Sequence, residues 1–179
     1  MYNRITLLGN AQDAGRPQFA CTNFCCEDAR LNPELSRMPV SLGLHGDSFG
    51  LIEATRCMDQ QLAMVDNPKI SDLWLTHAHL GHIEGLGQFG KESSNQKNIQ
   101  LHCSDSVYTY LQKHPIWNKL FVRGNLSLAD FSNLNVKPIL VPHRSDDFET
   151  HAFLIEGMCE NVLFLPDHDK WDSTLLRVN

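Results

Sequence analysis

The sequence predicts a single α/β (α+β) domain over residues 1–179. Short apolar runs of strand length alternate with segments of helical periodicity, which is the pattern of a domain that contains both sheets and helices. Two continuous apolar runs, Ile139–Val141 and Val162–Leu165, further predict strands that are buried on both faces. A chain of 179 residues with 42% hydrophobic side chains is long and apolar enough to bury such a core.

In the first half of the chain, glycines and a proline separate the expected elements. Gly9 ends the first strand, and Gly46 supplies the turn of a hairpin. Met58 and Leu62 begin a run at helical spacing that Pro68 closes. The expected elements are a strand at 4–8, a loop at 10–23, a hairpin of strands at 40–44 and 49–53, a helix at 56–65 and a strand at 70–75.

The second half continues the alternation of strands and helices. Ser104 or Asp105 can cap a helix that runs to about Lys113, and Pro115 forbids its extension. The expected elements are a strand at 99–103, that helix, and strands at 136–141, 151–156 and 162–165.

The composition narrows the classes of function. A net charge of −6, from 15 Lys and Arg against 21 Asp and Glu, argues against a nucleic-acid partner, which needs a basic surface. A small anionic substrate remains compatible with this charge, because a metal ion can supply local positive charge. No region has the length of a secretory or membrane-spanning apolar segment, so we expect a cytoplasmic protein without a membrane partner.

The strongest functional signal is the segment Thr76-His77-Ala78-His79-Leu80-Gly81-His82, which directly follows an apolar strand. In an extended segment, His77 and His79 can face the same side, and His82 comes one turn later. Three converging imidazoles suit a borderline-soft divalent metal such as zinc, iron or manganese. The alternative is three solvated loop histidines, which rarely cluster by chance behind a strand.

Two further candidate ligands also follow strands. His143 comes after Val141-Pro142, and Asp167 comes after Leu165-Pro166. Alone, each would read as a solvated residue at a turn. The ends of strands in packed sheets can meet at one rim, so we expect both side chains to join the histidine cluster there.

Together these motifs resemble the metallo-β-lactamase superfamily, whose usual pattern is H-x-H-x-D-H. The chain is most similar to the branch that includes coenzyme PQQ synthesis protein B and related phosphodiesterases. The resemblance covers nearly the whole chain. The further matching stretches are Ala11–Gln18, Ser41–Leu44, Ile52–Thr55, Val141–Arg144 and Pro166–Trp171.

The resemblance implies an αββα sandwich with a metal site at one rim. His77, His79 and His143 would hold a first ion, and His82 and Asp167 would belong to a second, with Asp167 as the bridge. Asp167 and His82 are therefore the candidate catalytic residues. A metal-activated water would attack an ester or a phosphodiester.

The chain departs from the superfamily pattern in two ways. Gly81 stands where a ligating aspartate is usual, which predicts a weak or absent second ion and a gain of metal in Gly81→Asp. The chain also ends before the final histidine of the superfamily, so we expect a truncated fold with an incomplete second layer. His168, Asp169 or Glu84 could replace or support a missing ligand.

A second constellation comprises Cys21, Cys25 and Cys26. Cysteines at this place are similar to a structural zinc site in the same branch, although a closed site needs a fourth ligand. The alternative is three ordinary cysteines in a loop.

Two other functions remain open. The chain could be a degenerate or truncated metal-binding relative without catalysis, or an accessory protein of PQQ-type cofactor synthesis. The sequence is also compatible with an oligomer.

Overall fold

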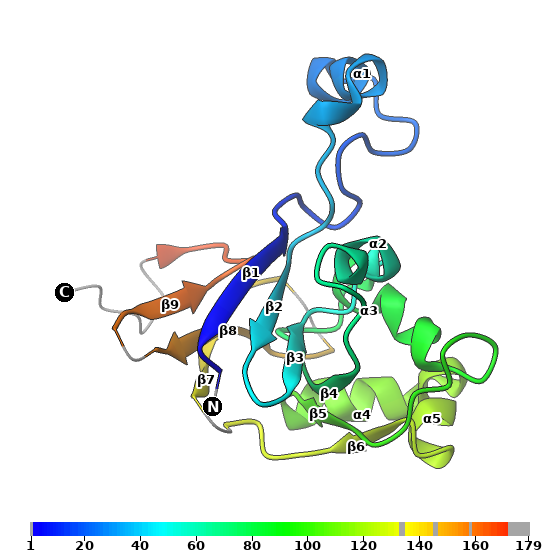
Figure 1. Cartoon of the computed structure of the whole chain (residues 1–179), viewed down its shortest axis with the longest axis vertical. Coiled ribbons are helices and arrows are strands. Elements are labelled where there is room, and N and C mark those ends of the chain that lie inside the picture. The colour runs from blue at the N-terminus through cyan, green and yellow to red at the C-terminus, as the bar shows by residue number, and fades with distance from the viewer. Residues whose placement is uncertain (1, 133–134, 145–146, 158, 172–179) are drawn as a thin grey trace.

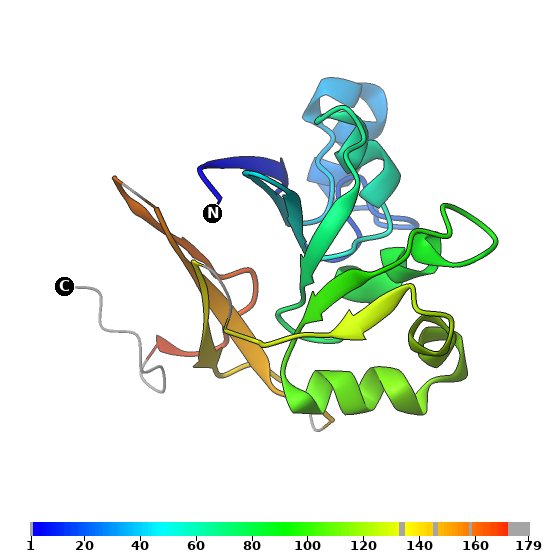
Figure 2. The ribbon, with the colours of Figure 1, turned by 60° about the horizontal axis from the view of Figure 1, so that its bottom comes forward.

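Two β-sheets organise the part of the chain that the computed structural model describes, which is residues 2–132, 135–144, 147–157 and 159–171. The strand order is β1-β2-β3-β4-β5-β6 in the larger sheet and β7-β8-β9 in the smaller one. Figure 2 shows the smaller sheet on one side of the larger sheet and most of the helices on the other side.

The larger sheet begins with antiparallel strands and continues with parallel ones. The β1–β2 and β2–β3 pairs are antiparallel, whereas β3 to β6 are parallel to one another. The expected hairpin is therefore confirmed as β2–β3. The strand bounds are β1 Arg4–Gly9, β2 Ser41–His45, β3 Phe49–Ile52, β4 Ile70–Trp74, β5 Ile99–His102 and β6 Leu126–Leu128.

Helices α2 to α5 lie along one side of the larger sheet, and α1 projects away from the sheets on an arm (Figure 1). The helix bounds are α1 Phe24–Leu31, α2 Met58–Ala63, α3 Leu80–Ile83, α4 Asp105–Lys113 and α5 Pro115–Val122, with 3₁₀ turns η1 Pro33–Leu35 and η2 Glu84–Phe89. The side chain of Ser104 caps α4 by accepting from the backbone N–H of Val107, at 3.3 Å.

Adjacent residues of the same strand pack into two separate hydrophobic cores. Leu51 and Leu73 belong to the core beneath the helices, together with Val107 of α4. The adjacent residues Ile52 and Trp74 belong to the core between the two sheets. Successive strand side chains point to opposite faces, so the central strands are buried on both sides as expected for a layered fold.

The smaller sheet is antiparallel and consists of β7 Val136–Val141, β8 Thr150–Glu156 and β9 Asn161–Phe164. Phe153 and Phe164 pack towards the larger sheet. The prediction that its apolar runs are buried on both faces is wrong, because Leu140 is 50% exposed and Leu163 is 36% exposed. Only one face of this sheet packs against the larger sheet in the described structure.

Several elements were not predicted from the sequence: helices α1, α3 and α5, the 3₁₀ turns η1 and η2, and strand β6. Pro115 does end the preceding helix, but it also occupies the first turn of α5. Proline is well suited to this position because the first turn needs no N–H donor from it. Among the described residues, none of the helices is long and apolar enough to cross a bilayer.

Candidate metal centre

The histidine segment connects β4 to α3 at the edge where the two sheets meet. Thr76 and His77 follow the buried strand, His79 precedes α3, and His82 lies within that short helix. The backbone N–H of His151, on β8, donates to the carbonyl of Thr76 at 3.0 Å. This bond joins the start of the histidine segment to the smaller sheet.

His77, His79 and His143 form a first group of candidate ligands. The Nδ1 atom of His79 lies 2.8 Å from His77 Nε2 and 3.3 Å from His143 Nε2. Two ligands of one tetrahedral ion lie about 3.3 Å apart if each bond is about 2.0–2.1 Å long. The three ring nitrogens therefore converge closely enough to bind one ion.

His77, His82 and Asp167 form a second group, which shares His77 with the first. Asp167 Oδ2 lies 2.9 Å from His82 Nε2 and 3.6 Å from His77 Nε2. Both histidines are almost fully buried. Sequence reasoning proposed five residues for this centre, and the structure brings all five together.

The loops that carry His143 and Asp167 are bonded to each other. The backbone N–H of Asp169 donates to the carbonyl of Pro142 at 2.9 Å. The side chains of His143 and Asp169 also meet, with 3.0 Å between Nδ1 and Oδ1. A proton on His143 Nδ1 leaves its Nε2 lone pair free to face the other histidines.

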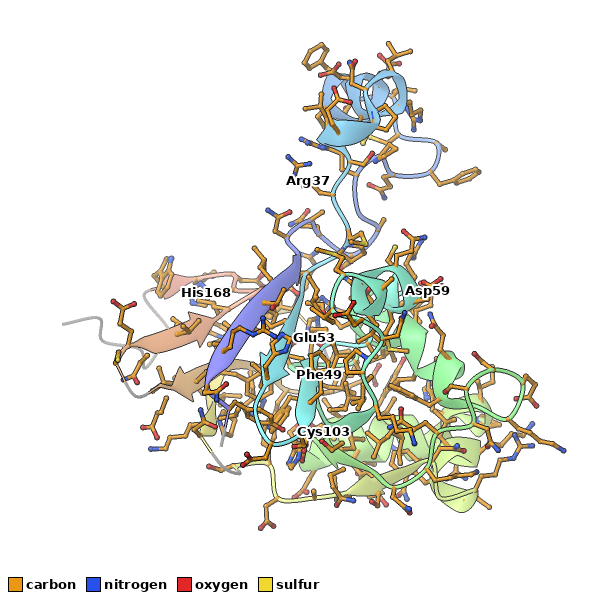
Figure 3. All side chains as sticks on the ribbon, viewed as in Figure 1. Arg37, Phe49, Glu53, Asp59, Cys103 and His168 are labelled. Carbon is orange, nitrogen blue, oxygen red and sulfur yellow. The ribbon has the colours of Figure 1, made fainter. Side chains whose placement is uncertain are left out.

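A buried chain of hydrogen bonds orients His77. The hydroxyl of Thr76 donates to Glu53 Oε1 at 2.5 Å, and His77 Nδ1 lies 2.9 Å from the Thr76 oxygen. Because the hydroxyl proton goes to Glu53, the Thr76 oxygen can accept from His77 Nδ1, which leaves Nε2 as the ligand atom. Figure 3 shows Glu53 beside β3, within the body of the molecule.

The electrostatics of the two buried histidines are opposite. Burial, followed by the neighbouring imidazoles, lowers the pKa of His77 to about 2, so its ring is neutral. Burial also opposes charge on His82, but the carboxylates of Glu53, Asp13 and Asp167 outweigh it and raise the pKa of His82 to about 12. The group around His82 therefore favours a positive charge at this position.

The residues present fit a divalent metal ion. Both ring nitrogens of His82 are buried without a hydrogen bond, although carboxylate oxygens lie 2.9–3.4 Å away. The donor atoms are imidazole nitrogens and carboxylate oxygens, which zinc, iron and manganese all accept. A cation between these groups would satisfy buried atoms that otherwise have no good partner.

The space beside Gly81 is already occupied by a carboxylate. A Cβ atom on Gly81 would lie 2.5 Å from the Cβ of Asp13 and 2.6 Å from its Oδ1. Asp13 Oδ1 itself lies 3.2 Å from His82 Nε2, and this interaction with His82 lowers the pKa of Asp13 to about 2. The expectation that Gly81 simply removes a carboxylate from this place needs correction.

Other candidate replacements for that carboxylate lie elsewhere. Glu84 pairs with Arg56 at 2.9 Å, and His168 packs against the ring of Trp171. Neither residue belongs to the ligand groups found among the described residues.

The three candidate cysteines, Cys21, Cys25 and Cys26, lie in α1 or just before it, on the arm that projects away from the sheets (Figure 1). Cys26 is buried and accepts from the backbone N–H of Gln18 at 3.4 Å, whereas Cys25 is exposed. Cys21, Cys25 and Cys26 do not form a three-ligand group in the described structure. A structural zinc ion at this place stays a prediction.

Sequence reasoning missed the roles of Asp13, Glu53 and Thr76. All three lie in or beside stretches that carry the family resemblance, which is the one signal that could have drawn attention to them. No spacing rule links Asp13 or Glu53 to His82, because those contacts form only when distant segments pack together.

Comparisons with known proteins identify the fold. No family model and no curated protein matches the chain. Among solved structures, a diphosphatase from the PhnP family has 20% identity and a TM-score of 0.65, and covers 83% of this chain. Zn²⁺-bound PqqB from Methylobacterium extorquens has 17% identity, a TM-score of 0.71 and 89% coverage. The metallo-β-lactamase fold protein YhfI from Bacillus subtilis has 16% identity, a TM-score of 0.61 and 89% coverage.

The matched region is a part of these relatives. The chain spans 60% of the diphosphatase and 61% of PqqB. At these identities the comparison establishes the fold alone, and the two β-sheets described above agree with it. The chain has the metallo-β-lactamase fold.

Proposed function

We propose that this protein is a metal-dependent hydrolase that directs a water molecule at an ester or phosphodiester. The observation that carries the proposal is the convergence of two adjacent ligand groups around His77, one of three imidazoles and one that contains His82 and Asp167. A divalent ion bound there would lower the pKa of its water from about 15.7 towards about 7 and polarise the electrophile.

The protein side chains position the water and its proton. Asp167 faces both ligand groups, and its Oδ2 can accept a hydrogen bond from the attacking water and fix its direction. Without an ion, His82 Nε2 lies 2.9 Å from the same oxygen and stabilises the ionised carboxylate. We therefore assign Asp167 to orienting the nucleophile and His82 to holding the second ion, which would take the place of the proton between Nε2 and Asp167.

The surrounding residues keep the ligand rings in place. Asp169 holds His143, and the Glu53–Thr76 pair holds His77, in each case through the Nδ1 atom. Ring orientation fixed in this way determines which nitrogen faces the metal. The Nε2 atoms of His77 and His143 are consequently the ligands in this assignment.

The proposed substrate is a small anionic molecule. The likeness to a PhnP-family diphosphatase supports a phosphorus ester, and the local charge of bound metal would offset the net charge of −6. The proposal also places the protein in the cytoplasm without a nucleic-acid partner, and leaves its oligomeric state to measurement.

The test measures hydrolysis of bis(p-nitrophenyl) phosphate and p-nitrophenyl acetate by the chain after loading with zinc, manganese or iron. We expect metal-dependent turnover that falls about 100-fold or more in Asp167→Asn, whose carboxamide cannot replace the carboxylate as a charged acceptor. The variant should keep the metal held by the three histidines.

One result would contradict this function. Metal bound by the histidines without turnover of either substrate class would favour the alternatives, a non-catalytic metal-binding relative or an accessory protein of PQQ-type cofactor synthesis.

A further inference from the structure

Asp13 is held beside the candidate metal centre by an anchored loop between β1 and α1. The backbone N–H of Ala11 donates to the carbonyl of Met38 at 3.0 Å, and that of Arg16 donates to Arg37 at 2.8 Å. Between these anchors, the N–H of Gly15 donates to the carbonyl of Gln12 at 2.7 Å and closes a turn around Asp13. The position of Asp13 is therefore set by backbone bonds on both sides.

The carboxylate of Asp13 lies close to one buried atom of the centre, His82 Nε2. His82 Nε2 lies 3.2 Å from Asp13 Oδ1 and 2.9 Å from Asp167 Oδ2. His82 is only 1% exposed, and neither of its ring nitrogens makes a hydrogen bond. This nitrogen thus points between two carboxylates that come from opposite ends of the described chain.

Gly81 makes this approach sterically feasible. Any side chain at residue 81 would place its Cβ 2.6 Å from the Cα of Asp13 and 2.5 Å from its Cβ. Real Cβ atoms essentially never show contacts under 3.0 Å. A residue without a Cβ is required wherever Asp13 lies this close.

We propose that Asp13 is a ligand of the second metal ion, together with His82 and Asp167. The carboxylate that a side chain at residue 81 would supply comes instead from the loop after β1. One imidazole and two carboxylates make a three-donor set of the kind that zinc, manganese or iron accepts. Asp13 lies outside the ligand groups found among the described residues, so its exposed carboxylate would turn from His82 towards the ion on binding. This inference rests on the proposed function, because it assumes that the histidines bind metal.

The two ion positions then differ in access to solvent. The side chain of Asp13 is 59% exposed, whereas His77 at the centre is fully buried. The second ion would exchange through the Asp13 side, and we expect it to be the more weakly bound of the two.

The experiment titrates metal-free protein with Zn²⁺ in a calorimeter and follows Co²⁺ binding by visible absorption. Wild type is compared with Asp13→Asn, which keeps the size of the side chain and removes its charge. Asp59→Asn is the matched control, because Asp59 is an exposed carboxylate on α2 (Figure 3). Intense thiolate-to-cobalt absorption would identify any ion that the cysteines bind, so that this ion can be subtracted.

We expect two ions per chain at the histidine centre of wild type and of Asp59→Asn. Asp13→Asn should keep the first ion and bind the second about 10–100-fold more weakly. Circular dichroism should show the same fold for all three proteins, because Asp13 makes its anchoring bonds through neighbouring backbone groups.

Two results would overturn the inference in distinguishable ways. If Asp13→Asn binds both ions as tightly as wild type does, Asp13 is not a ligand, and the proposed function is unaffected. If wild type and His77→Ala/His79→Ala take up equal amounts of metal, the histidines do not bind it, and both proposals fail.

Discussion

Replacing Gly81 by alanine should force the Asp13 loop away from His82. The added Cβ would lie 2.6 Å from the Asp13 Cα, so that atom must withdraw by about 0.8 Å to reach the 3.4 Å of ordinary contact. Overpacking of this kind costs about 1–3 kcal/mol. A displacement of that size also exceeds the roughly 0.2 Å tolerance of a metal–ligand bond, so the affinity for the second ion should fall.

The matched control is Gly87→Ala, where the nearest atom to the new Cβ is Trp117 Cζ3 at 4.0 Å. Urea unfolding of the metal-free proteins should give Gly81→Ala a free energy of unfolding about 1–3 kcal/mol below that of the control. In an Asp13→Gly background this difference should shrink, because two of the three clashing atoms are absent.

Equal stability of the two alanine variants, together with unchanged binding of the second ion, would refute the close approach of Asp13. The same reasoning reverses the expectation drawn from the sequence for Gly81→Asp. The new side chain would meet Asp13 before it met a metal ion, so we expect no gain in bound metal.

Two further predictions concern buried carboxylates. Glu53→Gln removes the charge that lies 3.4 Å from His82 Nδ1, and should weaken metal binding about 10–100-fold in a calorimetric titration. An unchanged metal affinity would show that Glu53 does not orient the ligand histidines. Burial opposes ionisation of Asp72, but bonds with His102 and Tyr2 outweigh it and lower its pKa. Its stabilisation is therefore present above the ordinary value of about 3.9 and is lost as the pH falls through the lower folded value. Urea midpoints of wild type and Asp72→Asn should converge at acid pH, and a constant difference would contradict this.

The candidate ligands of the centre could be predicted because their sequence signals are local. His77, His79 and His82 share one short segment, and His143 and Asp167 each follow an apolar strand. Strand ends that share a rim bring such residues together whatever their separation in sequence. This is why five candidate ligands could be named before their positions were known.

The supporting carboxylates could not be predicted in the same way. Asp13 lies in an irregular loop, and Glu53 adopts a positive φ of 69° just after β3. Nothing in the local pattern indicates that both face His82. The prediction for Gly81 considers only its own missing side chain, whereas the effect of this glycine depends on the loop that packs against it.

The errors in the prediction of the fold have similar causes. Pro115 predicts the end of one helix in the sequence, but proline also favours the first turn of a helix, which is its position in α5. The apolar runs of β7 and β9 predict strands that are buried on both faces. Burial depends on what packs against each face, however, and composition does not specify this.

The most direct test of the account is the metal content of the purified chain by elemental mass spectrometry, measured beside His77→Ala/His79→Ala. The variant removes two of the three imidazoles of the first ligand group and the His77 ring that borders the second, so we predict two ions per wild-type chain and the loss of both in the variant. Any ion at the cysteines would remain equally in both proteins. Equal metal content in the two proteins would contradict the histidine centre and, with it, the proposed function.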